Sequence, residues 1–333
     1  MTNTAKNSDL PISAADIDAA ARVIAPYAVR TPLLPSPALD ALTGGRVFIK
    51  PEVLQRTGSF KFRGAFNKLS SIPQAERGRG VVAFSSGNHA QGVAAAAQIL
   101  GMKATIVMPS DAPAMKVART RGYGAEVVLY DRDKEDREAI ARKISGDSGA
   151  TVVPPYDDVF VMAGQGTVGR EIAEDLAAQA VVPDIVSAQA SGGGLIGGIA
   201  VAIKSRFADA SIIVAEPAGY HDHELSLKAG KPVAHGNSGR TICDALMAQQ
   251  PGDITFAVNK HLVAGAVSAT DQEVMEAMAF AFRDLKLVVE PGGAVALAAL
   301  LKGKIDARGK TVVIVLSGGN VDAELYAKAI ASY

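Results

Sequence analysis

The chain has few of the residues that hold a disulfide-linked or zinc-bound scaffold together, and it has no excess of charge of either sign. Its single cysteine, Cys243, excludes an intramolecular disulfide and a cysteine-rich zinc site. Lysine plus arginine and aspartate plus glutamate number 34 each, so no net charge attracts the chain to nucleic acid or to an anionic membrane. We therefore expect a small-molecule partner.

Long hydrophobic runs are absent as well. No segment reaches the roughly 18 apolar residues that a membrane-spanning helix needs, and residues 1–13 lack the apolar core of a signal peptide. We therefore expect a cytoplasmic location. Of the residues present, 48% are hydrophobic and 20% are charged, a balance that lets the chain bury the cores of roughly two domains.

Short β-branched segments alternate with alanine-rich segments of helical length. The expected strands are VVAF (81–84), ATIVM (104–108), AEVVLY (125–130), DIVSAQA (184–190), SIIVAE (211–216) and TVVIVLS (311–317). The expected helices cover residues 89–100, 134–145, 163–179 and 271–285. Near-continuous apolar strands that alternate with helices are typical of parallel sheets covered on both faces. The sequence predicts an α/β fold of two doubly wound domains, one inserted into the other because no long linker separates them.

Two loops that follow expected strands are suited to binding anions. In SSGNHAQG (85–92), the backbone N–H groups at a helix start and the Asn88 amide suit a carboxylate, although serine and asparagine are also ordinary helix caps. In SGGGLIGG (191–198), three consecutive glycines remove every Cβ from the turn and let the backbone surround a phosphate. The spacing matches neither the P-loop nor the dinucleotide fingerprint, and a tight turn without a ligand is the alternative.

Two further stretches supply a hydroxyl and an amine. In LSGGN (316–320), the Ser317 hydroxyl can hydrogen-bond a ring nitrogen without fixing a proton on it. In SFKFRGA (59–65), aromatic neighbours can desolvate the Lys61 amine and lower its pKa toward the neutral form that attacks carbonyls. An ordinary surface lysine is the alternative. A reactive lysine together with a phosphate loop indicates pyridoxal phosphate, whose aldehyde takes the amine and whose phosphate takes the loop.

These four stretches, in this order and spread over nearly the whole chain, resemble those of the fold-type II pyridoxal-phosphate enzymes, which share the architecture of the tryptophan synthase β subunit. Within that family the chain is similar to the branch of threonine and serine dehydratases, 3-hydroxyaspartate dehydratases and serine racemases. The resemblance implies a large cofactor-binding domain made of residues 1–53 and 151–333, a small mobile domain at residues 54–150, and a homodimer.

The resemblance also implies a role for each matching residue. Lys61 matches the lysine that carries the cofactor, Phe60 the aromatic residue packed on its ring, and Ser317 the hydroxyl that faces the pyridine nitrogen. The asparagine bonded to the 3′-oxygen of the cofactor is matched by Asn88. The residues that match the phosphate loop are Ser191, Gly192, Gly193, Gly194 and Leu195. Those that match the loop for the substrate carboxylate are Ser85, Ser86, Gly87, Asn88 and His89.

The expected reaction is removal of the α-proton by the Lys61 amine and loss of a β-hydroxyl, which gives a 2-oxo acid and ammonia from threonine, serine or 3-hydroxyaspartate. Ser86 matches the second acid/base of serine racemases, so a serine or aspartate racemase with side dehydratase activity is the alternative. Ala248 stands where serine racemases carry a serine, which weakens that alternative. A catalytically silent amino-acid or nucleotide-binding module of the same fold is the third hypothesis.

Arg137 bears on the choice of substrate. It matches an arginine that reaches a dicarboxylate ligand in serine racemases, and a guanidinium pairs well with a second substrate carboxylate. This match makes 3-hydroxyaspartate a candidate beside threonine and serine. An exposed ion pair with Asp136 or Glu138 is the alternative.

A short acidic loop suggests a metal site. Glu216 and Asp222 supply hard oxygen ligands, and the carbonyl of Tyr220 lies between them, a set that suits Mg²⁺, with Ca²⁺ or Mn²⁺ as alternatives. The resemblance supports this prediction, since these residues match the divalent-ion site of the serine racemase branch. A solvated acidic loop is the alternative, and His221 and His223 add little to the prediction because they can equally be surface residues.

Overall fold

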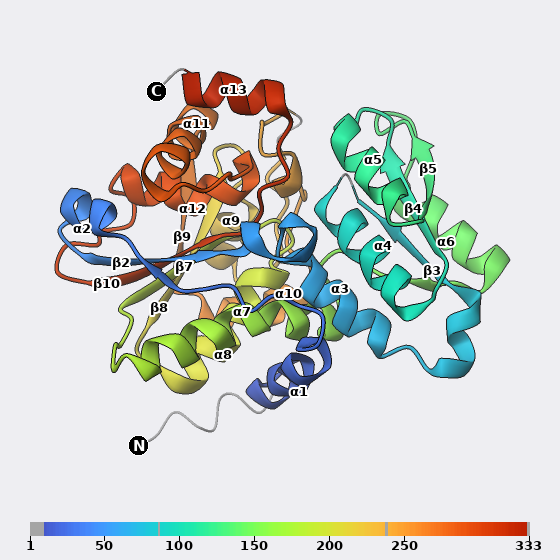
Figure 1. Cartoon of the computed structure of the whole chain (residues 1–333), viewed down its shortest axis with the longest axis horizontal. Helices are drawn as coiled ribbons and strands as arrows, with labels where there is room; N and C mark the ends of the chain where they lie inside the picture. Colours follow the sequence, from blue (N-terminus) through green and yellow to red (C-terminus); the bar gives the residue numbers. More distant parts are fainter. Residues whose placement is uncertain (1–9, 86, 237–238, 332–333) are drawn as a thin grey trace.

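The computed structural model describes residues 10–85, 87–236 and 239–331. Its strands form a six-stranded and a four-stranded sheet, each flanked by helices (Figure 1). Among the described strands, β1 pairs with β2 antiparallel, and all other neighbouring strands run parallel. The predicted α/β fold with mainly parallel sheets is therefore confirmed.

The larger sheet has the strand order β1-β2-β10-β7-β8-β9. Its strands are β1 Leu34–Pro35, β2 Arg46–Pro51, β7 Ile185–Gln189, β8 Ser211–Pro217, β9 Gly265–Ala269 and β10 Thr311–Leu316. The central strands β7 and β10 are almost wholly buried, which explains their uninterrupted apolar sequences. The expected strands at 184–190, 211–216 and 311–317 all lie here, whereas β2 and β9 were not anticipated.

The smaller sheet has the order β5-β4-β3-β6. Its strands are β3 Val81–Phe84, β4 Ala104–Pro109, β5 Glu126–Tyr130 and β6 Thr151–Val152. The strands expected at 81–84, 104–108 and 125–130 are found with small differences at their ends. The last strand, β6, begins directly after the domain boundary expected at residue 150, and the division into two domains stays a prediction.

Within the described residues, α-helices are distributed over the faces of the two sheets. They are α1 Ala14–Ile24, α2 Pro37–Thr43, α3 Lys61–Ser70, α4 Asn88–Leu100, α5 Ala114–Gly122, α6 Arg137–Ser148, α7 Val159–Ala178, α8 Gly194–Arg206, α9 Asp222–Ala229, α10 Asp253–Leu262, α11 Asp271–Phe280, α12 Pro291–Leu301 and α13 Ala323–Ala331. Helices α11, α12 and α13 lie on one face of the larger sheet, and α7 and α8 lie on the other (Figure 1). None of the helices within the described ranges combines the length and apolar character required to span a bilayer.

Local signals explain where several helices begin. Ser13 with Asp16 and Thr270 with Glu273 form capping boxes at the starts of α1 and α11, so each pair satisfies backbone N–H groups that the helix leaves free. Asp136 caps α6, which therefore begins later than the helix expected from residue 134. The helix expected over 271–285 also differs, because α11 ends at Phe280 and a π-helical turn follows.

The segment around Lys61 is helical and does not follow a strand directly. Two 3₁₀ turns, Glu52–Leu54 and Arg56–Gly58, lie between β2 and α3. The segment nevertheless reaches the carboxyl end of β10, because the Phe60 N–H donates to the Ser317 carbonyl at 3.1 Å. The tertiary structure thus brings Lys61 to the sheet edge from outside the sheet.

Close contact between two helices fixes the position of α3. A Cβ on Gly164 of α7 would lie 2.6 Å from the Cα atom of Gly64 in α3, which is closer than real Cβ contacts allow. Each helix thus has a glycine at the crossing, and the two backbones pack directly against each other.

A buried ionic network anchors α3 from its other side. Arg63 binds Glu52 through two nitrogens, at 2.7 and 2.8 Å, and it binds Glu171 of α7 at 2.7 and 2.9 Å. Lys50 of β2 donates to Glu171 at 2.6 Å, and Thr31 donates to Glu52 at 2.6 Å. Burial would raise the pKa of Glu52, but Arg63 outweighs burial and lowers that pKa. Glu52 is thus held ionised, and the two cations Arg63 and Lys50 match the two carboxylates.

We expect Arg63→Met to destabilise the protein by about 3–5 kcal/mol, since it leaves two buried carboxylates with too few partners. The matched control is Arg30→Met, because Arg30 pairs with Glu174 and Asp175 while its side chain is 50% exposed. Such an exposed pair contributes about 0–1 kcal/mol to the free energy of unfolding. Urea unfolding measures both values, and similar small losses in the two variants would contradict the anchoring role of Arg63.

Candidate active site

The carboxyl ends of strands from both sheets surround a cavity of about 420 Å³. Most residues expected at the active site line it together, although they come from segments far apart in the sequence. They are Phe60, Lys61, Ser85, Asn88, His89, Arg137, Ser191, Gly192, Gly193, Gly194, Leu195 and Ser317. Gly87 is the N-cap residue of α4 and does not line the cavity, and Ser86 lies outside the described residues. The metal candidates Glu216, Tyr220 and Asp222 lie elsewhere.

Lys61 has the environment of a reactive amine. It is the first residue of α3, and its Nζ donates to the Pro155 carbonyl at 2.6 Å and lies 5.2 Å from the ring centroid of Phe60. Burial lowers the pKa of Lys61 to about 8. An ordinary solvated surface lysine does not fit this placement.

The loop before α4 is held by contacts from both sheets. The Asn88 side chain donates to Glu290 and accepts from the Asn320 amide at 2.9 Å, so its direction is set by two buried partners. The Ser85 hydroxyl accepts from the Gly87 N–H at 3.1 Å. The amide of Asn88 is thus already fixed at the edge of the cavity.

His89 is kept neutral. Burial and the nearby Lys61 lower its pKa to about 3. Its Nε2 lies 3.0 Å from the Val153 carbonyl, which can only accept, so Nε2 carries the proton. His89 therefore adds no positive charge to the cavity at neutral pH.

Lys116 is a cavity residue that sequence reasoning missed. It lies in α5 and binds both oxygens of Asp244, at 3.0 and 2.8 Å, and its Nζ lies 3.2 Å from Glu290 Oε2. These carboxylates outweigh the effect of burial and raise the pKa of Lys116, which stays charged. No local pattern could reveal this group, since Lys116 and Asp244 are 128 positions apart. The ion pairs connect a helix of the smaller sheet with two segments of the larger one.

The glycine loop has the shape of an anion cradle. Gly193 has φ +95°, and a Cβ on it would lie 2.5 Å from the Asn259 amide nitrogen; a Cβ on Gly192 would lie 2.2 Å from the Tyr156 ring. Gly193 precedes α8, and no side chain among the described residues caps that helix. Free N–H groups at the start of a helix bind a phosphate well. The tight turn is therefore required by its neighbours and is open to an anion.

Ser317 is oriented by Gln189, a second residue that the sequence analysis did not select. Gln189 Nε2 donates to the Ser317 hydroxyl at 2.5 Å and to the Gly293 carbonyl at 2.9 Å. Because the hydroxyl oxygen accepts from Gln189, its own proton is free to donate to an acceptor in the cavity. This arrangement suits an unprotonated ring nitrogen.

Arg137 lies at the first position of α6 and lines the same cavity. Its guanidinium carbon lies 5.5 Å from the ring centroid of Phe84. The acidic neighbours Asp136 and Glu138 pair with Arg142 instead, at 3.7 and 3.6 Å. The structure therefore does not show the alternative considered from the sequence, in which Arg137 pairs with Asp136 or Glu138.

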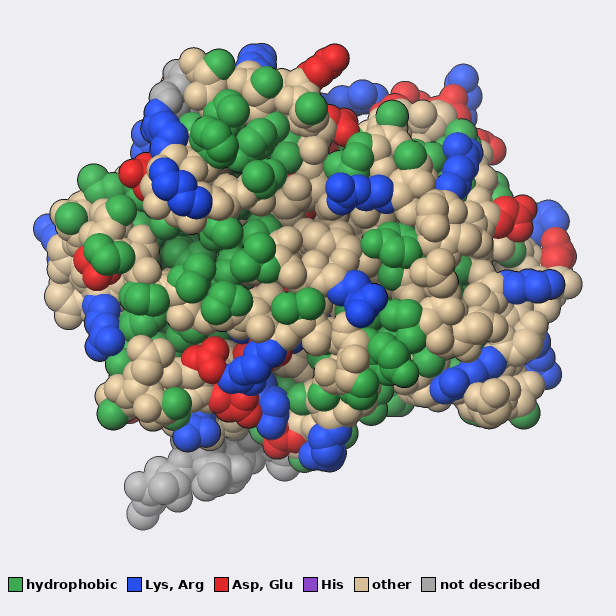
Figure 2. Space-filling view, in the orientation of Figure 1, with side chains coloured by type: hydrophobic (Ala, Val, Ile, Leu, Met, Phe, Trp, Pro, Cys, Tyr) green, Lys and Arg blue, Asp and Glu red, His purple; other side chains and the backbone are tan. Residues whose placement is uncertain are grey.

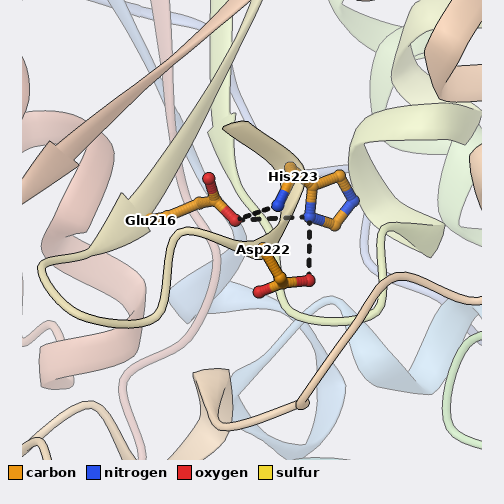
Figure 3. Close-up of side chains that lie close together, drawn as sticks. All are labelled: Glu216, Asp222 and His223. Atoms are coloured by element: carbon orange, nitrogen blue, oxygen red, sulfur yellow. Dashed lines mark hydrogen bonds and ion pairs between the residues drawn. The ribbon is translucent and has the colours of Figure 1, made fainter. Parts of the chain in front are cut away.

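Outside the cavity, Glu216, Asp222 and His223 form a buried cluster (Figure 3). His223 is not a surface residue, because its side chain is fully buried between the two carboxylates. Burial would lower the pKa of His223, but Asp222 and Glu216 outweigh it and raise that pKa to about 9. The solvated acidic loop considered above does not describe this site. Tyr220 lies in the same loop, and its role as a ligand stays a prediction.

A family model described as pyridoxal-phosphate dependent enzyme matches residues 24–318. The chain belongs to this family. It is 46% identical to the L-threo-3-hydroxyaspartate ammonia-lyase of Pseudomonas sp., over 95% of this chain and 97% of that one. It is 40% identical to the serine racemase of Schizosaccharomyces pombe, over 94% and 95% of the two chains. The crystal structure of a threonine deaminase from T.th. matches with a TM-score of 0.87 and 42% identity, over 93% of this chain and 99% of that one.

These matches confirm the predicted branch of dehydratases and racemases. They also confirm that the chain is a pyridoxal-phosphate-dependent enzyme and not a catalytically silent binding module. The cavity fits the cofactor. It offers a lysine of low pKa for the aldehyde, a glycine cradle for the phosphate and a donor hydroxyl for the ring nitrogen.

The lowered pKa makes the attachment of pyridoxal phosphate to the cofactor-free protein pH-dependent. Only the neutral amine of Lys61 attacks the aldehyde, so the rate should rise about tenfold per pH unit below pH 8 and level off above it. Stopped-flow absorbance of the cofactor measures this rate. A rate that keeps rising beyond pH 10, as for a solvated lysine, or attachment that survives Lys61→Ala would contradict the role given to Lys61.

Proposed function

We propose that this enzyme removes water from a 3-hydroxy amino acid and that 3-hydroxyaspartate is its preferred substrate. The observation that carries the choice of substrate is the placement of Arg137 in the cavity wall with its acidic neighbours paired to Arg142. A guanidinium that faces a cavity can bind a second carboxylate through two hydrogen bonds. The ammonia-lyase of Pseudomonas sp. acts, by its name, on such a dicarboxylate.

Lys61 is the proposed base. When bound, pyridoxal phosphate supplies an electron sink that acidifies the α-carbon of the substrate. The Lys61 amine, once displaced by the substrate amine, accepts the α-proton, and a pKa of about 8 suits an exchange of protons near neutral pH. The β-hydroxyl then leaves with a proton as water, and the released enamine hydrolyses to a 2-oxo acid and ammonia.

Ser317 favours elimination over slower outcomes. Its hydroxyl can donate a hydrogen bond to a ring nitrogen but does not protonate it. The ring would therefore stabilise negative charge at the α-carbon only modestly. Prompt loss of the β-hydroxyl relieves that charge. We assign Asn88 to the 3′-oxygen, Phe60 to the ring, residues 191–195 to the phosphate, and residues 85–89 to the α-carboxylate of the substrate.

Racemisation is the second candidate function. The relative from Schizosaccharomyces pombe is a serine racemase, and an aspartate racemase structure matches with a TM-score of 0.88 and 31% identity. Racemisation requires an acid on the face of the α-carbon opposite Lys61, the role proposed for Ser86. Ala248 lines the cavity at the position where serine racemases carry a serine that contacts the substrate. Because this chain lacks that hydroxyl, we place racemisation second.

We propose a divalent cation at Glu216 and Asp222, with the Tyr220 carbonyl as a further ligand. The two carboxylates are buried together, and buried negative charges need a cation or protons beside them. Mg²⁺, Ca²⁺ and Mn²⁺ suit oxygen ligands. The cation lies outside the cavity, so its proposed role is structural.

We also propose a homodimer in solution. Hydrophobic side chains gather on one face of the part built on the larger sheet (Figure 2). Exposed large apolar residues such as Leu54, Phe282 and Val288 are candidates for burial between subunits. Sedimentation equilibrium should give twice the chain mass of 34.3 kDa, and a single-chain mass at micromolar concentration would contradict the proposal. The expected cytoplasmic location also stays a prediction.

A substrate panel tests the function. L-serine, L-threonine and the 3-hydroxyaspartate isomers are incubated with the holoenzyme, and the 2-oxo acid and the amino-acid enantiomers are measured separately. We expect kcat/KM to be highest for a 3-hydroxyaspartate isomer. Arg137→Ala should lower that value roughly 10- to 150-fold, because the substrate loses a hydrogen-bonded ion pair. Values for serine should change by less than about threefold, because serine has no second carboxylate.

Lys143→Ala is the matched control, since Lys143 lies on the same helix, is exposed and pairs with Asp147, away from the acidic neighbours of Arg137. It should leave all values near those of the unmodified enzyme. Equal losses for serine and 3-hydroxyaspartate in Arg137→Ala would remove the second-carboxylate role. Enantiomer exchange that is faster than formation of the 2-oxo acid would favour the racemase.

A further inference from the structure

The cluster of Glu216, Asp222 and His223 contains buried polar atoms that make no hydrogen bond of ordinary length. The exposed fractions of the three residues are 0%, 1% and 0%. Neither Asp222 Oδ2 nor His223 Nδ1 has a hydrogen-bond partner among the described residues. Buried polar atoms without partners are costly, so such a pair indicates a bound group.

The distances within the cluster suit ligands of one ion better than hydrogen bonds. His223 Nδ1 lies 3.4 Å from Glu216 Oε1 and 3.4 Å from Asp222 Oδ2, beyond the usual range for N–H···O bonds (Figure 3). One ligand atom from each residue lies within 4.8 Å of the others. Two atoms bound at about 2.1 Å to the same ion lie about 3 Å apart in an octahedral arrangement and farther apart in a tetrahedral one.

The Glu216 carboxylate is fixed in place for this role. Its Oε1 accepts from the His223 N–H at 2.8 Å, and its Oε2 accepts from the Glu224 N–H at 3.1 Å. Each oxygen keeps a lone pair for a further partner. The backbone at the start of α9 therefore orients the carboxylate and the imidazole toward each other.

We infer that His223 Nδ1 is a ligand of the divalent cation, so that the site selects a transition ion such as Mn²⁺, Co²⁺ or Zn²⁺ over Mg²⁺ and Ca²⁺. This inference rests on the cation site proposed above at Glu216 and Asp222. An imidazole nitrogen binds borderline transition ions better than it binds hard ions, which favour oxygen ligands. Binding of the ion replaces a proton on Nδ1.

The other ring nitrogen connects the site to the glycine loop. His223 Nε2 lies 3.3 Å from Asn259 Nδ2, and the same amide donates to the Gly193 carbonyl at 3.3 Å. With an ion on Nδ1 the proton resides on Nε2 and needs an acceptor. Turning the amide over would supply Asn259 Oδ1 as that acceptor, and the Gly193 carbonyl would then lose the bond that it now accepts from Nδ2. Asn259 is therefore a positioning residue for His223.

The test uses Mn²⁺ on the holoenzyme. Electron spin echo envelope modulation should detect a directly bound ¹⁴N nucleus, and protein grown with ¹⁵N-imidazole histidine should show the corresponding ¹⁵N coupling. The labelled protein keeps the test valid even if a variant fails to fold. Calorimetric titration with Co²⁺ and with Mg²⁺ gives the selectivity, which should favour Co²⁺ and fall at least roughly tenfold in His223→Asn.

His221→Asn is the matched control, because His221 lies in the same loop and is partly exposed. It should keep both the nitrogen coupling and the selectivity. Stoichiometric Mn²⁺ binding without histidine nitrogen coupling would overturn the inference and leave the oxygen site standing. Absence of Mn²⁺ binding would overturn both. The substrate panel is read independently, so loss of the proposed lyase function would not be confused with either result.

Discussion

The ion pairs of Arg63 determine where the reactive lysine stands. Arg63 lies two positions beyond Lys61 on α3 and binds Glu52, next to β2, and Glu171, on α7. Because these side chains are buried, their charges are stable only when paired, and the pairing holds α3 between the two segments. The direct packing of α3 on α7 removes any remaining freedom. The amine is thereby presented to the cavity without a flexible loop to carry it.

Some charged groups of the cavity are paired within the protein, and we assign Arg137 to the substrate. Lys116 is neutralised by Asp244 and Glu290, and His89 is held neutral by burial. Arg137 is the cation in the cavity wall that we assign to a ligand, and Lys61 becomes neutral near pH 8. An anionic ligand paired with Arg137 would therefore share the cavity with a nucleophilic amine.

Much of the cofactor site could be predicted from the sequence, because its features are local. Three consecutive glycines, a serine after the last apolar strand and a lysine between phenylalanines keep their chemical character wherever the chain places them. The strands were found because buried parallel strands are apolar throughout. Helix ends were less well predicted, since α6 depends on the Asp136 cap and α11 on a π-helical turn.

The sequence by itself determined the fold class, the cofactor chemistry and the segments that supply it. Only the tertiary structure decided which charged residues are buried and which partners they meet. From the sequence His223 could equally be a surface residue, but it lies buried between two carboxylates, and Lys116 meets a partner 128 positions away. The pKa of each group depends on burial and on neighbours within a few ångströms, and neither can be read from adjacent residues in a chain that folds through parallel sheets.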